Sequence, residues 1–280
     1  MIELANIHKS FGPKHVLQGI DLTVEKGESL VVIGGSGSGK SVMMKSIIGL
    51  LRPEQGSIRI NGVETIGISA RQRDKVNRQF GMLFQHGALL DSLPVWQNVA
   101  FAVRQQKNIS TAQARAIAQE SLSLVGLGAK LLDLYPADLS GGMHKCVGLA
   151  RAIAAKPPIL FFDEPTTGLD PVMTDIINHL IRDCVRELGA TTLTITHDMS
   201  SARIMADKVA FLYQGKIIWV GTEKEMTNSD DPFLHQFVNG LADGPIATEG
   251  VIEEERERGR QEERAEGRGK ERAEEQNGAP

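Results

Sequence analysis

The feature that most constrains the fold of this chain is a glycine-rich loop between an apolar strand and a helical stretch. Ser29–Ile33 (SLVVI) is a continuous apolar run, which is typical of a parallel strand buried on both faces. The loop that follows, GGSGSGKS at residues 34–41, fits the pattern GxxxxGK followed by Ser or Thr, and it leads into the helical stretch VMMKSIIGLL before Pro53. This order predicts an α/β protein that binds a nucleotide through its phosphates.

Each residue type in the loop suits phosphate binding. Glycines let backbone N–H groups converge on phosphate oxygens without Cβ clashes, and the helix N-terminus adds positive potential. Lys40 supplies a cation for the β- and γ-phosphates, and Ser41 offers a hydroxyl to Mg²⁺. A dinucleotide-binding loop is disfavoured, because GxGxxG has no reason to be followed by Lys-Ser. The predicted nucleotide-binding residues of the loop are Gly34, Gly35, Ser36, Gly37, Ser38, Gly39, Lys40 and Ser41.

A second apolar run, Ile159–Asp163 (ILFFD), ends in a carboxylate and is followed by Glu164. Parallel strands place their carboxyl ends on one edge of a sheet, where ligands bind. Asp163 would then meet Mg²⁺, directly or through water, and Glu164 would polarise the attacking water as general base. Taken alone, the two acids could simply cap a helix on the surface. The phosphate loop earlier in the chain favours the catalytic interpretation.

Strands alternate with helices along most of the chain, which predicts a mainly parallel sheet with helices on its faces. Ser110 with Gln113 forms the pattern of a capping box and predicts a helix from residue 111. The predicted strands are 2–7, 20–24, 29–33, 57–60, a strand leading to Gln85, 159–163, 191–196, 209–213 and 216–220, and the other predicted helices are 143–155 and 170–188.

Composition excludes several classes of protein. The net charge is −4, and residues 253–275 hold ten acidic and seven basic residues, or −3, so the remainder is close to neutral. This lacks the basic field that nucleic-acid binding needs, and we expect no nucleic-acid partner. No apolar stretch could span a bilayer, and the N-terminal residues show no signal pattern, so we expect a cytosolic chain. Cys146 and Cys184 do not have metal-ligand spacing.

Further motifs identify a family. Leu139–Met143 (LSGGM) precedes the acidic strand, Gln85 follows an apolar strand, and His197 closes TTLTITH. The turn 165–171 (PTTGLDP) follows Glu164, and Phe11 lies upstream of the phosphate loop. In this order and at these spacings, the set closely resembles the ATP-binding subunit of ABC transporters.

The resemblance implies a P-loop NTPase fold of the ABC type, with a mainly parallel central sheet, a small N-terminal β-subdomain and a helical insert at about 86–157. It covers an ATP-binding domain at 1–245. Residues 246–280 are expected to be a charged, disordered tail, because their composition offers too little apolar surface to bury. A solvated tail and a tail that binds a partner remain alternatives.

The resemblance also assigns roles to single residues. Phe11 would stack on adenine, where the family usually has Tyr, although it could instead be a packed core aromatic. Gln85 would contact Mg²⁺ or the attacking water, and His197 would hold the γ-phosphate. The expected catalytic residues are Glu164, His197, Gln85 and Lys40, and the expected metal ligands are Ser41, Gln85 and Asp163. The expected cofactors are ATP and Mg²⁺.

Ser140, Gly141 and Gly142 would contact the γ-phosphate of ATP bound to an opposite protomer, and Asp170 would lie at that interface. The chain would therefore form a homodimer around two ATP molecules. The helix that follows departs from the family pattern at Met143, His144, Lys145, Cys146 and Gly148. These departures bear on the ion pairing and rigidity of that helix and leave the anion contact unchanged.

LSGGM, TTGLDP and residues 232–245 together resemble the Mla/Mce branch of lipid transporters. That likeness implies phospholipid transport across a bacterial envelope, which maintains outer-membrane lipid asymmetry. The implied partners are membrane permeases and an Mce-type lipid-binding protein, and the implied location is the cytoplasmic face of the inner membrane. Residues 86–99 could line a groove for the permease or belong to the subdomain core. An importer of an amino acid, metal or other solute remains an alternative, as does a soluble ABC ATPase.

Overall fold

The computed structural model describes residues 1–246. The chain divides into two compact units, Met1–Asn228 and the residues from Ser229 onward, and each is described by itself. The predicted charged tail, apart from its first residue, lies outside the described residues.

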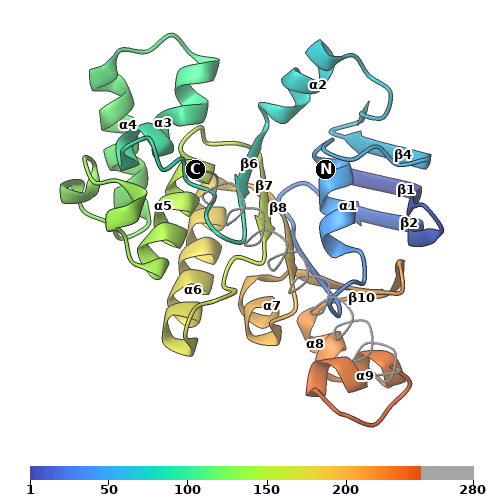
Figure 1. Cartoon of the computed structure of the whole chain (residues 1–280). Coiled ribbons are helices and arrows are strands. Elements are labelled where there is room, and N and C mark those ends of the chain that lie inside the picture. Colours follow the sequence, from blue (N-terminus) through green and yellow to red (C-terminus); the bar gives the residue numbers. More distant parts are fainter. Residues whose placement is uncertain (247–280) are drawn as a thin grey trace, which may run out of the picture. The chain divides into compact units, whose positions relative to one another are not determined.

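A six-stranded sheet with the order β10-β9-β3-β8-β7-β6 forms the centre of the first unit (Figure 1). Every pairing from β9 to β6 is parallel, and only β10 runs antiparallel, on β9. The predicted α/β class and mainly parallel central sheet are therefore confirmed. The strands are β3 (Ser29–Ile33), β6 (Phe80–Leu83), β7 (Ile159–Asp163), β8 (Thr191–Thr196), β9 (Lys208–Tyr213) and β10 (Lys216–Gly221).

A second, antiparallel sheet has the order β2-β1-β4-β5, the expected N-terminal β-subdomain. The first two strands are longer than predicted, because they pair with each other as far as Phe11 and Lys14 on either side of a tight turn. Phe11 therefore ends a strand. The bounds are β1 (Ile2–Phe11), β2 (Lys14–Val24), β4 (Gln55–Ile60) and β5 (Val63–Glu64).

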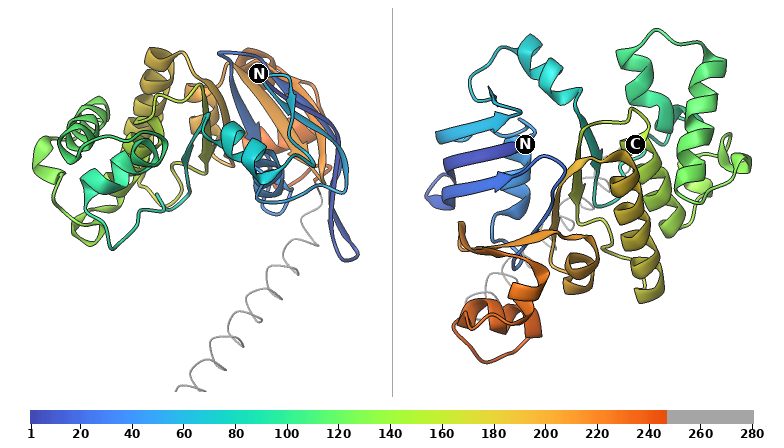
Figure 2. Two further views of the ribbon diagram at one scale, coloured as in Figure 1. Left: turned by 90° about the horizontal axis from the view of Figure 1, so that it is seen from above. Right: turned by 180° about the vertical axis from the view of Figure 1, so that it is seen from behind.

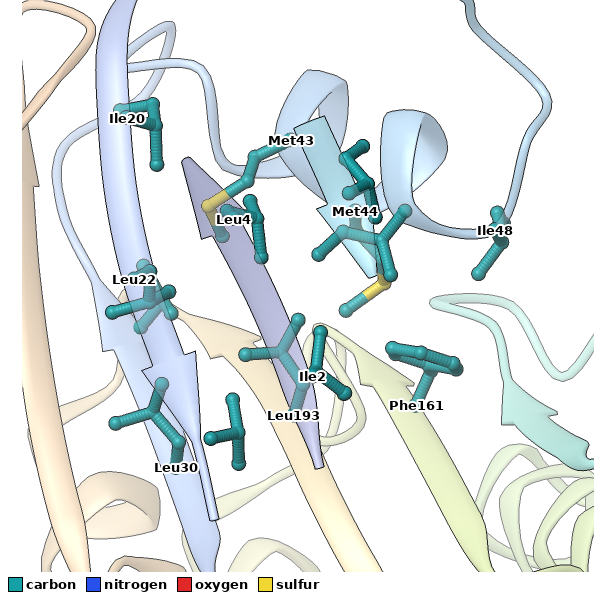
Figure 3. Close-up of a cluster of buried hydrophobic side chains, with 14 of the residues drawn as sticks. Ile2, Leu4, Ile20, Leu22, Leu30, Met43, Met44, Ile48, Phe161 and Leu193 are labelled. Atoms are coloured by element: carbon teal, nitrogen blue, oxygen red, sulfur yellow. The ribbon is translucent and has the colours of Figure 1, made fainter. Parts of the chain in front are cut away.

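The main core lies between these two sheets and encloses α1 (Lys40–Ile47), the helix that follows the phosphate loop. Figure 3 shows Met43 and Met44 of this helix among the aliphatic side chains of both sheets, with Phe161 of β7 on one side. All three side chains are fully buried. Burial of such side chains stabilises a fold by about 1.5–3 kcal/mol each, so the packing of α1 fixes the loop at its N-terminus.

Three helices of the insert, α3 (Val95–Gln106), α4 (Thr111–Leu124) and α5 (Gly141–Ile153), pack on one another (Figures 1 and 2). Of these, α5 also packs against β6. The predicted capping box is present, since Ser110 accepts a hydrogen bond from the N–H of Gln113 and α4 begins at Thr111. No helix among residues 1–246 is long and apolar enough to cross a membrane. The helices are α2 (Ala70–Asn77), α3 (Val95–Gln106), α4 (Thr111–Leu124), α5 (Gly141–Ile153), α6 (Pro171–Leu188), α7 (Met199–Met205) and α8 (Glu223–Thr227), with α9 (Pro232–Asn239) in the second unit.

Candidate functional site

The phosphate loop begins where β3 ends, and two of its glycines are required by close approaches. A Cβ on Gly34 would lie 2.3 Å from the carbonyl oxygen of Leu212, so no other residue fits there. Gly39 has φ +110°, and its Cβ would lie 2.9 Å from Leu17 Cδ2. The neighbouring Gly37 has φ +75°, a conformation that glycine adopts without strain. The loop is thus held tightly against β2 and β9.

The ammonium group of Lys40 lies over this loop. Its Nζ donates hydrogen bonds to the carbonyl oxygens of Gly34 at 2.7 Å and Gly35 at 2.9 Å. Burial lowers the pKa of Lys40, and the negative charges of Glu164 and Asp163 partly oppose that shift. The cation is therefore positioned between the loop and the acidic edge of the sheet.

The serines of the loop fit a phosphate ligand. Ser38 Oγ is buried and has no hydrogen-bond partner among the described residues, so a phosphate oxygen would satisfy it. Ser36 is exposed, and Ser41 is half-buried in the first turn of α1. The glycines, the buried lysine and the orphan hydroxyl together match the chemistry of a nucleoside triphosphate.

The acidic pair lies at the carboxyl end of β7. Burial raises the pKa of Asp163, and the negative charge of Glu164 raises it further. The positive charges of Lys45, Lys40 and Lys145 act in the opposite direction. A divalent cation would remove the cost of keeping this half-buried carboxylate ionised, which is consistent with a Mg²⁺ ligand at Asp163.

The side chain of Glu164 meets that of His197 because β7 and β8 pair in register up to Asp163 and Ile195. The two atoms Glu164 Oε2 and His197 Nδ1 are 2.9 Å apart. Thr167 Oγ1 also donates to Oε2, at 3.1 Å. The Glu164 side chain is 13% exposed and that of His197 is 59% exposed, so the carboxylate is shielded while the imidazole faces the open edge.

Glu164 also has an unusual backbone conformation. Its φ is +47°, which is uncommon for a residue other than glycine, and its N–H donates to the carbonyl oxygen of Ile195 at 3.0 Å. Strained backbone of this kind persists only where surrounding structure determines it, and it clusters at functional sites. The bond to Ile195 and the contacts of the carboxylate with the next strand provide that support.

Gln85 follows β6, whose Leu83 is paired with Phe162 of β7. Its place beyond the end of β6 puts it at the same edge of the sheet as Asp163. The backbone carbonyl of Gln85 accepts a hydrogen bond from Lys145 Nζ of α5.

Phe11 ends β1 and is 48% exposed, which argues against the alternative of a buried core aromatic. The ammonium group of Lys9 lies 5.2 Å from the centroid of its ring, within the range of a cation–π contact. An exposed ring at this position can still stack on a planar base.

The motif at the start of α5 is not brought to the phosphate loop. Ser140 caps the helix by accepting a hydrogen bond from the N–H of Met143 at 3.4 Å, and Gly141 begins it. A Cβ on Gly142 would lie 2.4 Å from Met173 Cε of α6. Within residues 1–246, no hydrogen bond or ion pair joins these residues to residues 34–41.

Asp170, in contrast, caps α6. Its Oδ1 accepts hydrogen bonds from the N–H groups of Val172 and Met173, each at 3.0 Å. The carboxylate therefore has a structural role in the single chain as well as its predicted place at an interface.

The contacts of α5 with the segment after β6 were not predicted from the sequence. Lys145 and Arg151 both donate to backbone carbonyls of that segment. The signal available in the sequence was the presence of two cations, Lys145 and Arg151, within one predicted helix. In the structure, Lys145 is buried. Their partners are backbone atoms, which sequence patterns do not identify.

The geometry defines a P-loop nucleoside triphosphatase: a glycine loop after a central parallel strand, a buried lysine, and acids at the carboxyl edge of the neighbouring strands. The ABC transporter family model matches residues 17–167, more than half of the chain. The chain belongs to the ABC transporter family. Its enzymatic activity is ATP hydrolysis coupled to transport, and the predicted family resemblance is confirmed.

Several individual proteins are similar to this chain. "Probable ribonucleotide transport ATP-binding protein mkl" of Mycobacterium bovis is 41% identical over 91% of the chain and 70% of its own length. "Intermembrane phospholipid transport system ATP-binding protein MlaF" of Haemophilus influenzae is 36% identical over 88% of the chain and 93% of its own length. Among solved structures, the dimeric bacterial ABC transporter cassette MJ0796 matches with a TM-score of 0.74 and 30% identity, covering 79% of the chain and 98% of the cassette.

Proposed function

We propose that this chain powers a membrane permease for phospholipids by hydrolysing MgATP in a composite dimer site. The observation that carries the hydrolytic part is the contact of 2.9 Å between Glu164 and His197, beside Asp163 and Lys40 at one edge of the sheet. A shielded carboxylate next to a phosphate-binding loop is the arrangement that activates water for phosphoryl transfer.

In this proposal, the loop amides and Lys40 bind the phosphates, and Phe11 stacks on the adenine. Ser41, Asp163 and Gln85 would hold Mg²⁺, which supplies charge neutralisation on the β- and γ-phosphates. Glu164 takes the proton of the attacking water.

His197 contributes charge stabilisation in the same step. It donates to the γ-phosphate from its exposed position after the end of β8, beside the base. Because Glu164 Oε2 is shared by the imidazole and by Thr167, rotation of the imidazole toward a phosphate would leave the carboxylate held by the threonine.

The position of Ser140, Gly141 and Gly142 supports a composite site. They lie at the N-terminus of a helix, a favourable place for an anion, and none contacts its own phosphate loop in the described residues. A second copy would supply the nucleotide they bind. The similar cassette MJ0796 is described as dimeric, which supports a homodimer here.

The phospholipid cargo rests on the comparisons. Besides MlaF, "Protein TRIGALACTOSYLDIACYLGLYCEROL 3, chloroplastic" of Arabidopsis thaliana is 38% identical over 88% of this chain and 75% of its own length. The second candidate is a solute importer. It is favoured by the 41% identity to "Methionine import ATP-binding protein MetN" of Rhizobium johnstonii, over 79% of this chain and 60% of that protein. The proposed partners are membrane permeases and an Mce-type lipid-binding protein. The proposed location of this chain itself is the cytoplasmic face of the inner membrane.

The catalytic assignment is tested with Glu164→Gln in the full-length chain. We expect phosphate release to fall by about 10²–10⁴-fold, while ATP binding is retained and a nucleotide-bound dimer accumulates. Glu120→Gln is the matched control, because Glu120 is an exposed carboxylate that pairs with Lys156. A Glu164→Gln chain that turns over ATP at the wild-type rate would refute the assignment of the base.

The cargo is tested by purifying the detergent-solubilised complex from membranes and analysing its lipids. Enriched phospholipid with a permease supports the lipid proposal. A periplasmic solute-binding protein without enriched phospholipid supports the importer, and recovery with no permease would refute both.

A further inference from the structure

One face of α5 contacts the backbone of the segment that follows β6. Lys145 Nζ donates to the carbonyl oxygen of Gln85. Six residues further along the helix, Arg151 Nη1 donates to the carbonyl of Ala88 at 2.6 Å, and Nη2 donates to that of Gly87 at 2.8 Å. Two cations from one helix therefore bind three carbonyls within four consecutive residues.

The helix approaches this segment closely because a glycine lies between the two cations. A Cβ on Gly148 would be 3.3 Å from Gly87 Cα and 3.4 Å from Gly87 O. Positions 145, 148 and 151 recur every third residue and share a face of the helix. We call Lys145, Gly148 and Arg151 the α5 contact face.

The segment itself has a conformation that needs support. Gly87 has φ +72°, and the next residue, Ala88, has φ +48° although it carries a Cβ. Left-handed backbone is unfavourable for alanine, so it persists where neighbouring groups determine it. Arg151 binds the carbonyls of these two residues. The α5 contact face thus fixes the shape of the chain next to Gln85.

Within the α5 contact face, Lys145 also interacts electrostatically with the acidic residues at the carboxyl end of β7. It is only 5% exposed, an unusual position for a lysine. Burial lowers its pKa, while the charges of Glu164 and Asp163 raise it. Lys145 therefore contacts the backbone of Gln85 and lies within the electrostatic range of the two acids of its own site.

The N-terminus of the same helix has a different assignment. Ser140, Gly141 and Gly142 are proposed to bind the nucleotide of the opposite protomer, and Lys145 follows in the next turn. An α-helix transmits a displacement of one turn to the next, because each turn is hydrogen-bonded to its neighbours. A movement of α5 caused by nucleotide on one protomer would therefore move the carbonyl of Gln85 in the other.

We propose that Lys145 is a positioning residue that couples the two ATP sites of the dimer. Binding at one site shifts the N-terminus of α5, and Lys145 conveys that shift to Gln85 and the acidic edge of the second site. The proposal rests on the composite dimer site of the proposed function, and it adds a residue whose own position touches neither nucleotide.

The test compares Lys145→Met, Lys145→Gln and Lys145→Arg in the full-length chain, with Lys156→Met as control. Lys156 is an exposed lysine of the same region that pairs with Glu120. For Lys145→Met and Lys145→Gln we expect kcat to fall by at least tenfold, or about 1.4 kcal/mol, with the Kd for ATP unchanged. The wild-type dimer, with two sites, should have a Hill coefficient for ATP of about 2. In these two variants it should fall toward about 1.

Lys145→Arg keeps the cation and should regain most of both kcat and cooperativity, and Lys156→Met should match the wild type. The proposal is overturned if the neutral variants keep the wild-type kcat and Hill coefficient, if the wild type itself has a Hill coefficient of about 1, or if ATP affinity is lost in parallel with thermal stability. Should Met disrupt folding, the polar but uncharged Gln provides the same comparison, because it too removes the positive charge that Lys145→Arg keeps. If Glu164→Gln abolishes turnover while Lys145→Met does not, the coupling proposal fails and the proposed function stands.

Discussion

Gly148→Ala sets two opposing effects against each other in α5. Alanine is favoured over glycine in a helix interior by about 1 kcal/mol. Against this, the new Cβ would lie 2.8 Å from Leu83 Cδ1 and 3.3 Å from Gly87 Cα. Leu83 is fully buried, so its side chain has little space to move, and Gly87 is held by Arg151. Overpacking of this kind typically costs about 1–3 kcal/mol.

We therefore expect Gly148→Ala to lower the free energy of unfolding by about 1 kcal/mol, since the overpacking term exceeds the helix-propensity term. For a domain of this size, that change corresponds to a Tm decrease of about 2–4 °C. Urea denaturation of the nucleotide-free chain, followed by circular dichroism, measures the change directly.

Leu83→Val provides the control, because it removes a methylene group beside the new Cβ. If steric overlap is the cause, the double variant should be less destabilised than the sum of the two single variants. A Gly148→Ala chain more stable than the wild type would refute the reasoning, because helix propensity would then outweigh the contact with Leu83. Strict additivity would also contradict it.

Three further perturbations have defined outcomes. Gly34→Ala should destabilise the nucleotide-free chain in thermal unfolding, whereas Gly35→Ala should not, because a Cβ at Gly34 meets a carbonyl at 2.3 Å and one at Gly35 meets nothing within 4 Å. Phe11→Ala should weaken ATP binding by about 10–100-fold in a fluorescence titration, and Phe11→Tyr should preserve it, because a stacked base contributes about 1–3 kcal/mol. Burial raises the pKa of Asp163 above the ordinary aspartate value of about 3.9. Folding stability therefore falls as the pH rises from about 3.9 through the raised pKa. Asp163→Asn should therefore be more stable than the wild type at pH 7 without nucleotide, and a Tm difference that persists undiminished at pH 3 would contradict this sign.

Patterns that are local in sequence were sufficient for much of the fold. The buried strands β3, β7 and β8 were predicted with their observed bounds, because short runs of apolar or β-branched residues between turn signals allow few alternatives. The helix after Ser110 began where its capping box indicated. The same chemistry at Ser69 and Gln72 marks α2, which the sequence analysis did not predict although the signal was present.

Contacts between distant segments were beyond such patterns. The strand β1 extends to Phe11 because β2 pairs with it, and neither segment alone determines the other's length. The roles of Glu164 and His197 were predicted separately, but their contact depends on the register between β7 and β8. The bonds from Lys145 and Arg151 end on backbone oxygens, whose positions depend on how the whole insert packs.

The strands of the central sheet differ in how easily they open, according to their place in the strand order. The strand before the phosphate loop, β3, is flanked on both sides by parallel neighbours. Within residues 1–246, the four-residue strand β6, which precedes Gln85, lies at the edge of the sheet and is bonded to β7 alone. Opening at an edge breaks one row of hydrogen bonds, so amide protons of β6 should exchange with deuterated solvent long before those of β3. The segment around Gln85 can therefore shift during each catalytic cycle while the phosphate loop keeps its position.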